Sequence, residues 1–350
     1  MTAIAGSRTA ARVLVGAAAA SALALAGCGT GSGGGGVATG AITVYSGQHP
    51  QTTALLVSAF ERRTGVRVAE RDGDEDVLAQ QIVQEGGRSP ADVYYAENSQ
   101  ALQFLSEKGL LAPVTPGTLA AVPAADESPG GSWVGVTARV SGIVYNTRLL
   151  SPSQVPTSVR QLADGRWAGK LGLAPSETDF QPVISSLSHS DGRAGALSWL
   201  EAVKRNAGSH VYPDNETLVA QINAGQVALG IVNHYYWYRL RYEIGSGRMH
   251  SAFATLAPRD PGYVLDVSGA AVLRSSRHQA DAQRFLAFLV SPAGQEVIAR
   301  SQSYEYPLGS GVATAQPIPA FAGLRPSPVS IAELGDGAAA VALLREAQLL

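Results

Sequence analysis

The first part of the chain alternates between two kinds of hydrophobic pattern. Short runs rich in valine, isoleucine and tyrosine have the length of buried strands, and longer segments repeat apolar residues every three or four positions, as amphipathic helices do. The predicted strands are residues 41–45, 66–70 and 91–95, and the predicted helices are residues 52–65, 74–87 and 99–109. Strands that alternate with helices predict a parallel or mostly parallel sheet with helices on both faces.

The rest of the chain continues this alternation. The predicted strands are residues 141–146, 169–174, 226–232 and 269–275, and the predicted helices are residues 195–206, 218–225 and 336–350. Residues 280–301 predict two helices that are separated before Pro292, because proline cannot continue the first helix. Residues 41–350 therefore predict an α/β protein, and a length of about 310 residues predicts two domains.

The N-terminus has a different composition. Arg8 and Arg12 precede an alanine-rich apolar run that is too short for a stable membrane span, so we assign residues 1–27 to a signal peptide. The run ends in "LAGC", which resembles the lipobox of bacterial lipoproteins and implies that Cys28 carries the lipid. The alternative is an ordinary secretory signal with a chance cysteine. Residues 28–40 are rich in glycine and predict a flexible tether.

Charge and cysteine content narrow the class of protein. Cys28 is the only cysteine, so no intrachain disulfide can form. The formal net charge is −2 at pH 7, without a basic stripe, so nucleic acid is not an expected partner. A lipid anchor, a tether and a long α/β segment predict an extracytoplasmic protein that contacts the cell membrane through its anchor alone.

Candidate chemistry lies at the ends of three predicted strands. His49 comes four residues after the first strand, and Glu97 comes two residues after the third. Tyr235 and Tyr236 come three and four residues after the strand that ends at Val232. Ligands of open α/β sheets bind beyond the carboxyl ends of the strands, so these side chains share one topological position. At the start of a helix, two adjacent tyrosines diverge by only about 100° and can reach one point.

A carboxylate, an imidazole and two phenols form a hard set of oxygen and nitrogen donors. Such sets favour hard cations, and tyrosinate is a known iron ligand. Calcium and magnesium would need more carboxylates, and zinc more cysteine or histidine, so Fe(III) fits best. Each residue also has an ordinary explanation: His49 as a polar residue at a helix start, Glu97 as an acid favoured by a helix dipole, and the tyrosines as packing.

Five segments of the sequence resemble the periplasmic ferric-ion-binding proteins, which are the substrate-binding components of iron ABC transporters. They read "ITVYSGQH", "PADVYYAENS", "NHYYWY", "YEYPL" and "ELGDGAAAVALLREAQLL". By motif position, the resemblance implies that the iron ligands are His49, Glu97, Tyr235 and Tyr236. It also implies that the protein is a monomer that captures Fe(III) between two lobes and delivers it to an ABC permease, without catalysis.

The fold implied by this resemblance is the type II periplasmic-binding-protein fold. It is an α/β fold of two lobes, each a mixed sheet flanked by helices, and the lobes are joined by hinge strands. We assign residues 41–137 with 266–315 to lobe 1, and residues 138–265 with 316–350 to lobe 2. Because phenols and imidazole must lose protons to bind a metal, the resemblance also implies that iron uptake releases protons and that acid favours iron release.

One segment departs from the family pattern. Better-known members hold a synergistic anion such as phosphate in a loop of small residues, whereas residues 175–180 here read "PSETDF". Glu177 and Asp179 would repel an anion, so we predict that iron binds without a tightly held external anion. Glu177 either supplies the missing negative charge or is a solvated loop acid. The candidates for the surroundings of the ligands or the anion side are Ser176, Glu177, Thr178, Asn215 and Asn233.

Two alternatives remain open on the sequence. The same fold could bind an organic cation such as thiamine or a polyamine, with the aromatic rings against the cation and Glu97 paired with its charge. A metal-dependent hydrolase using His49 and Glu97 is the alternative from another class of protein. The sequence contains no HExxH segment, no G-x-S-x-G segment and no nucleophile paired with a base, which argues against the hydrolase.

Overall fold

The structure, a computed structural model, describes residues 41–126, 128–309 and 311–350. The predicted signal peptide, the proposed lipidation site Cys28 and the predicted tether lie outside the described residues. The strands are β1 (Ala41–Ser46), β2 (Arg67–Asp72), β3 (Val93–Ala96), β4 (Val134–Asn146), β5 (Leu171–Gly172), β6 (Leu229–Asn233), β7 (Ser251–Ala254), β8 (Leu265–Val272) and β9 (Tyr306–Pro307). The helices are α1 (Pro50–Thr64), α2 (Glu75–Glu85), α3 (Ser99–Glu107), α4 (Pro116–Leu119), α5 (Phe180–Ala207), α6 (Asn215–Ala224), α7 (His234–Ile244), α8 (Gln279–Leu289), α9 (Pro292–Arg300), α10 (Ile331–Leu334) and α11 (Ala338–Glu346).

The strands form a mixed sheet in the order β2-β1-β3-β8-β4-β6-β5, with β7 and β9 also paired to β4. Pairs β1–β2, β1–β3 and β5–β6 are parallel, whereas every pair made by β4 with β6, β7, β8 or β9 is antiparallel. The prediction of a mostly parallel sheet is therefore wrong. The strand–helix alternation holds for β1 to β3, but β8 then returns beside β3 in the opposite direction.

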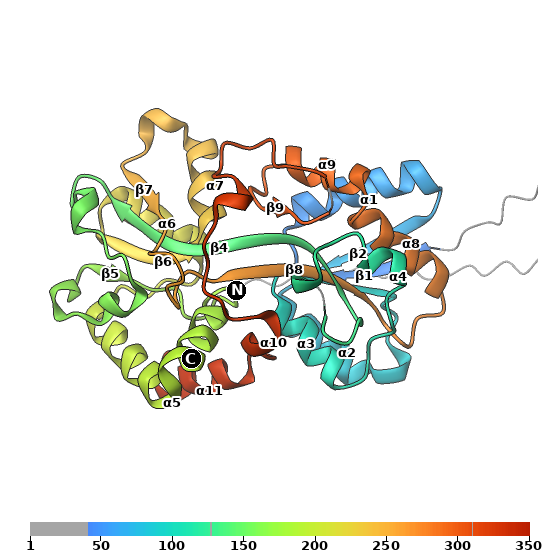
Figure 1. Ribbon diagram of the computed structural model, residues 1–350, viewed down its shortest axis with the longest axis horizontal. Helices are drawn as coiled ribbons and strands as arrows, with labels where there is room; N and C mark the ends of the chain where they lie inside the picture. The colour runs from blue at the N-terminus through green and yellow to red at the C-terminus, as the bar shows by residue number, and fades with distance from the viewer. Residues whose placement is uncertain (1–40, 127, 310) are drawn as a thin grey trace, which may run out of the picture. The chain divides into compact units, whose positions relative to one another are not determined.

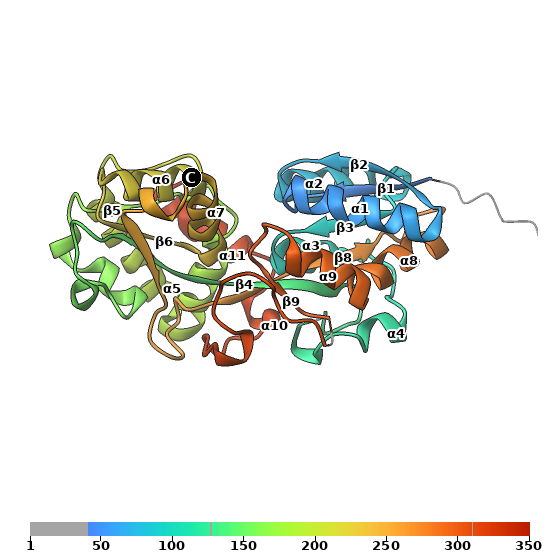
Figure 2. The ribbon, with the colours of Figure 1, turned by 90° about the horizontal axis from the view of Figure 1, so that it is seen from above.

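Strand β4 connects the two groups of strands (Figures 1 and 2). Its first part pairs with β8 and β9, and its second part pairs with β6 and β7. All of its residues are buried, so it lacks the alternation of a half-buried strand, and the sequence pattern predicted only residues 141–146. The boundary predicted after residue 137 falls inside β4 and the one after residue 265 falls at the start of β8; both positions stay predictions.

Helices cover the strands on both sides (Figure 1). In the N-terminal group, Phe60 of α1 packs against Phe285 of α8, with ring centroids 5.0 Å apart. Helix α5 begins at Phe180, well before the predicted start at residue 195, because the sequence pattern predicted only its second half. The two halves meet at Gly192, whose φ of 75° interrupts the helical repeat. Within the described part of the chain, no helix has the length and apolar character needed to cross a membrane.

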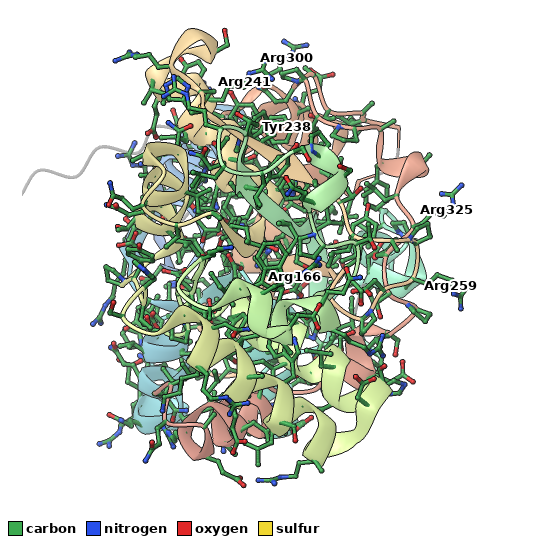
Figure 3. All side chains as sticks on the ribbon, turned by 90° about the vertical axis from the view of Figure 1, so that its left-hand side faces the viewer. Arg166, Tyr238, Arg241, Arg259, Arg300 and Arg325 are labelled. Atoms are coloured by element: carbon green, nitrogen blue, oxygen red, sulfur yellow. The ribbon has the colours of Figure 1, made fainter. Side chains whose placement is uncertain are left out.

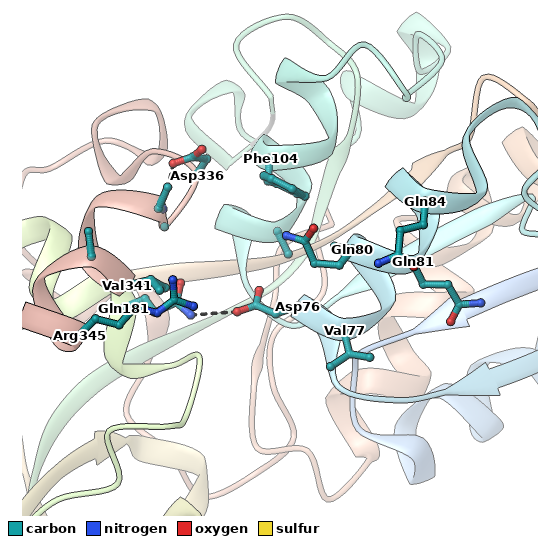
Figure 4. A pocket seen from close by; sticks show the side chains of 15 residues that line it. Asp76, Val77, Gln80, Gln81, Gln84, Phe104, Gln181, Asp336, Val341 and Arg345 are labelled. Atoms are coloured by element: carbon teal, nitrogen blue, oxygen red, sulfur yellow. Dashed lines mark hydrogen bonds between the residues drawn. The ribbon is translucent and has the colours of Figure 1, made fainter. Parts of the chain in front are cut away.

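A cavity of about 760 Å³ lies between α2 and α3 on one side and α5 and α11 on the other (Figure 4). Gln181 of α5 donates a hydrogen bond of 3.0 Å to Asp76 of α2 in this cavity. None of the site residues predicted from the sequence lines it. The candidate chemistry therefore lies in another part of the molecule.

Candidate metal centre

The predicted ligands lie where a strand gives way to a helix. His49 immediately precedes α1, whose first residue Pro50 has the backbone conformation that favours a helix start. Glu97 lies between β3 and α3. Strand β6 runs directly into α7, so Tyr235 and Tyr236 fall in the first turn of a helix, and both are buried. The local structure thus agrees with the expected strand-end positions.

The structure brings the four predicted ligands together. Nε2 of His49 lies 3.2 Å from Oε1 of Glu97, and the Tyr235 hydroxyl donates a hydrogen bond of 2.5 Å to the same carboxylate oxygen. The rings of His49 and Tyr235 meet edge to face, with centroids 5.0 Å apart. Tyr236 lies against Tyr235, with ring centroids 4.2 Å apart. A carboxylate and an imidazole from one group of strands therefore meet two phenols from the other.

A fifth residue, Asp179, joins the phenols, and the sequence did not identify it as part of the centre. Oδ2 of Asp179 accepts hydrogen bonds from Tyr235 and Tyr236, at 2.8 Å and 2.9 Å. Asp179 is only 6% exposed. From the sequence, Asp179 is expected to be a loop acid that repels anions. Its position soon after β5, at another strand end, was the signal that could have placed it with the ligands.

The other predicted residues surround the centre unevenly. Oε2 of Glu177 lies 3.4 Å from the Tyr236 hydroxyl and accepts a weak hydrogen bond of 3.5 Å from Asn215. Thr178 accepts a hydrogen bond of 3.0 Å from Asn98, the residue after Glu97. Ser176 is exposed and donates to the backbone of Pro213, away from the phenols. Asn233 is buried at the end of β6, but among the described residues its side chain makes no hydrogen bond to the centre.

A buried arginine lies behind the centre and was not predicted from the sequence. Arg139 of β4 is fully buried, whereas Arg166, Arg300 and Arg325 extend from the surface (Figure 3). Its guanidinium donates a hydrogen bond of 2.6 Å to Asn98. Ion-pair distances join it to carboxylates from three segments: Asp179 at 3.7 Å, Asp266 at 3.9 Å and Glu305 at 3.6 Å. Arg139 therefore brings three buried carboxylates together next to the phenols.

The protonation of the aromatic groups follows from their burial. Burial, followed by the charges of Asp179 and Glu97, raises the pKa of both Tyr235 and Tyr236 well above 10, so both phenols keep their protons without a cation. Burial, followed by the positive charges of Arg239 and Arg139, lowers the pKa of His49 well below 6.5. The imidazole is therefore neutral at pH 7, which is the form that binds a metal.

Negative charge exceeds positive charge around the centre. Four carboxylates act on Arg139: Asp266, Asp179, Glu97 and Glu305. With Arg239, which lies 4.9 Å from the ring centroid of Tyr235, four negative and two positive charges sum to −2 if all four carboxylates are ionised. Burial raises the pKa of Asp179, and Glu97 raises it further. Burial and the charge of Asp179 raise the pKa of Glu177 to about 8. Such a surplus favours a cation at the centre and disfavours an added anion.

Two buried atoms support the fit of a metal ion. Nε2 of His49 and Oδ1 of Asp179 are both inaccessible to solvent and make no hydrogen bond, although ionic groups lie nearby. Buried polar atoms without a hydrogen bond are rare because their desolvation is not compensated. The described residues contain no group of three or more His, Cys, Asp or Glu side chains arranged to hold a metal ion. A metal at this centre would therefore depend on the two phenols.

Comparison with known proteins defines the class to which the chain belongs. Residues 88–322 match the family of bacterial extracellular solute-binding proteins, and the chain is a member of that family. Members bind a substrate for transport and are not enzymes, so the hydrolase alternative is wrong and the predicted absence of catalysis is confirmed. The family relationship suggested by the sequence motifs is confirmed as well.

The chain is similar to several ferric-iron proteins. It is 35% identical to the Fe(3+)-binding periplasmic protein of Serratia marcescens over 89% of this chain and 92% of that protein. It is 34% identical to the major ferric iron-binding protein of Neisseria meningitidis, over 89% and 93% of the two chains. The crystal structure of iron-bound HitA from Pseudomonas aeruginosa matches with a TM-score of 0.84 and 37% identity, covering 88% of this chain and 99% of that one. The predicted two-lobed type II periplasmic-binding-protein fold is confirmed.

Proposed function

We propose that this protein captures Fe(III) outside the cytoplasm and delivers it to the permease of an ABC transporter. His49, Glu97, Tyr235 and Tyr236 would bind one ion per monomer. The observation that carries this proposal is a cluster of two buried phenols that both donate to Asp179, one of which, Tyr235, also donates to Glu97 beside the neutral imidazole of His49. Phenolate, carboxylate and imidazole suit a hard trivalent cation, and several proteins similar to this chain in both sequence and structure are ferric-iron proteins.

An organic cation is the weaker candidate for the substrate. An aromatic cage needs open ring faces, but the guanidinium of Arg239 lies 4.9 Å from the ring centroid of Tyr235, and the ring of Tyr236 lies against the same side chain. The phenol oxygens point to carboxylates at hydrogen-bond distance. These features favour a small ion.

A spectroscopic titration tests the proposed function. We expect Fe(III), supplied as a citrate complex, to give a visible absorption band that saturates at one ion per chain, because phenolate donates charge to ferric iron. Thiamine and spermidine should give no band and no increase in melting temperature, whereas a ligand that binds the folded state stabilises it. A colourless protein that is stabilised by thiamine or spermidine would reject the iron proposal.

Protons compete with iron for the phenols. Both phenols keep their protons in the metal-free protein because their pKa values lie well above 10, so iron binding must displace these protons. The affinity for iron should therefore fall as the pH falls.

We also propose that Cys28 is acylated and forms the mature N-terminus. The support is the "LAGC" sequence after the apolar run. We expect the native protein to partition into detergent and to give a lipid-modified N-terminal peptide in mass spectrometry, and Cys28→Ala to move the protein to the aqueous fraction. A native protein that is already soluble and begins at another residue would show that the cysteine is incidental.

A further inference from the structure

We propose that Asp179 is a fifth protein ligand of the bound ion, so that the chain itself supplies the anionic group that completes the centre. This inference rests on the proposed function, because it names a further ligand for the same Fe(III). The candidate atom is Oδ2, which accepts a hydrogen bond from each phenol, at 2.8 Å and 2.9 Å. A metal bound by both phenolates would lie next to this oxygen.

The side chain of Asp179 contacts Arg139 and the phenols and does not cap its own helix. It occupies the N-cap position of α5, where an aspartate usually accepts a hydrogen bond from the helix backbone, but its side chain makes no such bond. It turns instead toward Tyr235 and Tyr236 of α7. Its second oxygen, Oδ1, is buried and lacks a hydrogen bond. A buried carboxylate in this state is costly, which a cation at the centre would offset.

Arg139 fixes the orientation of this carboxylate. Its guanidinium lies 3.7 Å from Oδ1 of Asp179, on the side of the carboxylate away from the phenols. The same guanidinium donates to Asn98, next to Glu97 in the chain. Arg139 thus keeps Oδ2 directed at the phenol oxygens and ties the carboxylate to the residues around Glu97. This is the arrangement expected of an outer partner that orients a metal ligand.

Glu177, the other acid in this loop and one of the two explanations left open for the missing charge, has a weaker position. Its Oε2 is 3.4 Å from the Tyr236 hydroxyl and makes no hydrogen bond to Tyr235. Glu177 is also partly exposed, whereas Asp179 is buried. With Asp179 the centre would have one nitrogen and four oxygen donors, all supplied by the chain, and the two phenolates would complete the set, since among the described residues His49, Glu97 and Asp179 are not arranged to hold an ion by themselves. An external anion would meet the carboxylates of Asp179 and Glu97, where repulsion is poorly screened.

The test compares Asp179→Asn with Glu177→Gln, a matched loss of a carboxylate two residues away. Each protein is titrated with Fe(III) citrate in buffer free of phosphate and carbonate. For Asp179→Asn we expect affinity to fall more than about 100-fold, the upper end of the loss caused by an outer partner. The visible band should also move to longer wavelength, because iron that has lost an anionic ligand accepts charge more easily. Glu177→Gln should leave the band in place and lose less affinity.

A second variant separates ligation from support of the tyrosines. Asp179→Ala leaves space for a small carboxylate, so added acetate should restore both the band and the affinity of this variant while leaving the wild type unchanged. If the wild type is coloured and Asp179→Asn keeps the same band and affinity, the role of Asp179 is rejected alone. Failure of acetate to restore Asp179→Ala would also reject ligation by Asp179. A colourless wild type would instead reject the proposed iron function itself.

Discussion

Replacing Tyr235 or Tyr236 with phenylalanine is expected to lower the affinity for Fe(III) by at least about 100-fold. Residues that only hydrogen-bond to a metal ligand already contribute about 10- to 100-fold to metal affinity, and the loss of a ligand itself should cost more. Each substitution deletes one oxygen and keeps the ring that packs in the core. The Tyr235 hydroxyl reaches both Glu97 and Asp179, and the Tyr236 hydroxyl reaches Asp179. Affinity is measured by competition against citrate, with the intensity of the visible band as a second readout.

The metal-free variants should remain folded. Loss of a hydrogen bond to a charged group costs about 1.5–3 kcal/mol, which urea unfolding of the metal-free protein would resolve. Tyr238→Phe is the matched control, because Tyr238 lies on the same helix and stacks on Tyr304 at 5.8 Å, outside the centre. It should keep both colour and affinity. If both single variants at Tyr235 and Tyr236 also keep them, the phenols are packing residues and iron is bound elsewhere or not at all.

Much of the N-terminal part of this architecture could be predicted from the hydrophobic pattern. Strands β1 to β3 and helices α1 to α3 match their predicted ranges within a few residues, because each strand is short, each helix is amphipathic, and a turn residue separates them. This local accuracy also placed His49 and Glu97 at strand ends. The convergence of these residues with Tyr235 and Tyr236 followed from topology, since ligands collect at the carboxyl ends of strands.

The hydrophobic pattern could predict neither the full length of strand β4 nor the contacts of Arg139. Residues 134–146 are buried throughout, so they show neither the period of a half-buried strand nor that of a helix. A charged residue within an otherwise apolar and neutral segment was the available signal. Its meaning depends on Asp179, Asp266 and Glu305, which are distant in sequence and approach only in the folded chain.

Asp179 shows a second limit of prediction from the sequence, which concerns side-chain orientation in a loop. The sequence shows two acids in the loop before α5, Glu177 and Asp179, and the predicted repulsion of an external anion stays a prediction. It could not show which of Glu177 and Asp179 turns inward, because both lie in a short irregular segment without periodicity. The tertiary contact with two phenols decides that question. The consequence is that the charge predicted for the loop is present but is carried closest to the phenols by Asp179.

Replacing Arg139 with methionine is expected to destabilise the metal-free protein by about 3–5 kcal/mol at neutral pH, the usual cost of breaking a buried ion pair by removing one partner. The volume of the side chain is largely kept, but Asp179, Asp266 and Glu305 lose their buried cation. Urea unfolding at pH 7 measures the loss. Arg160→Met is the control, because Arg160 is 48% exposed and its ion pair with Asp191 should contribute no more than about 1 kcal/mol.

The pH dependence of this loss gives the sharper test. Burial raises the pKa of Glu305 from 4.5 to about 7 and raises the pKa of Asp266, while the charge of Arg139 lowers both values. Without Arg139 both pKa values rise further, so the folded variant binds more protons than the unfolded chain between about pH 4.5 and a value above 7. Its stability must therefore fall as the pH rises through this window. The wild type also keeps the Glu305 proton below about pH 7, so the difference from wild type should grow as the pH rises above 7 and should be smaller below it. A loss that is equal at all pH values would assign Arg139 a packing role without an electrostatic one.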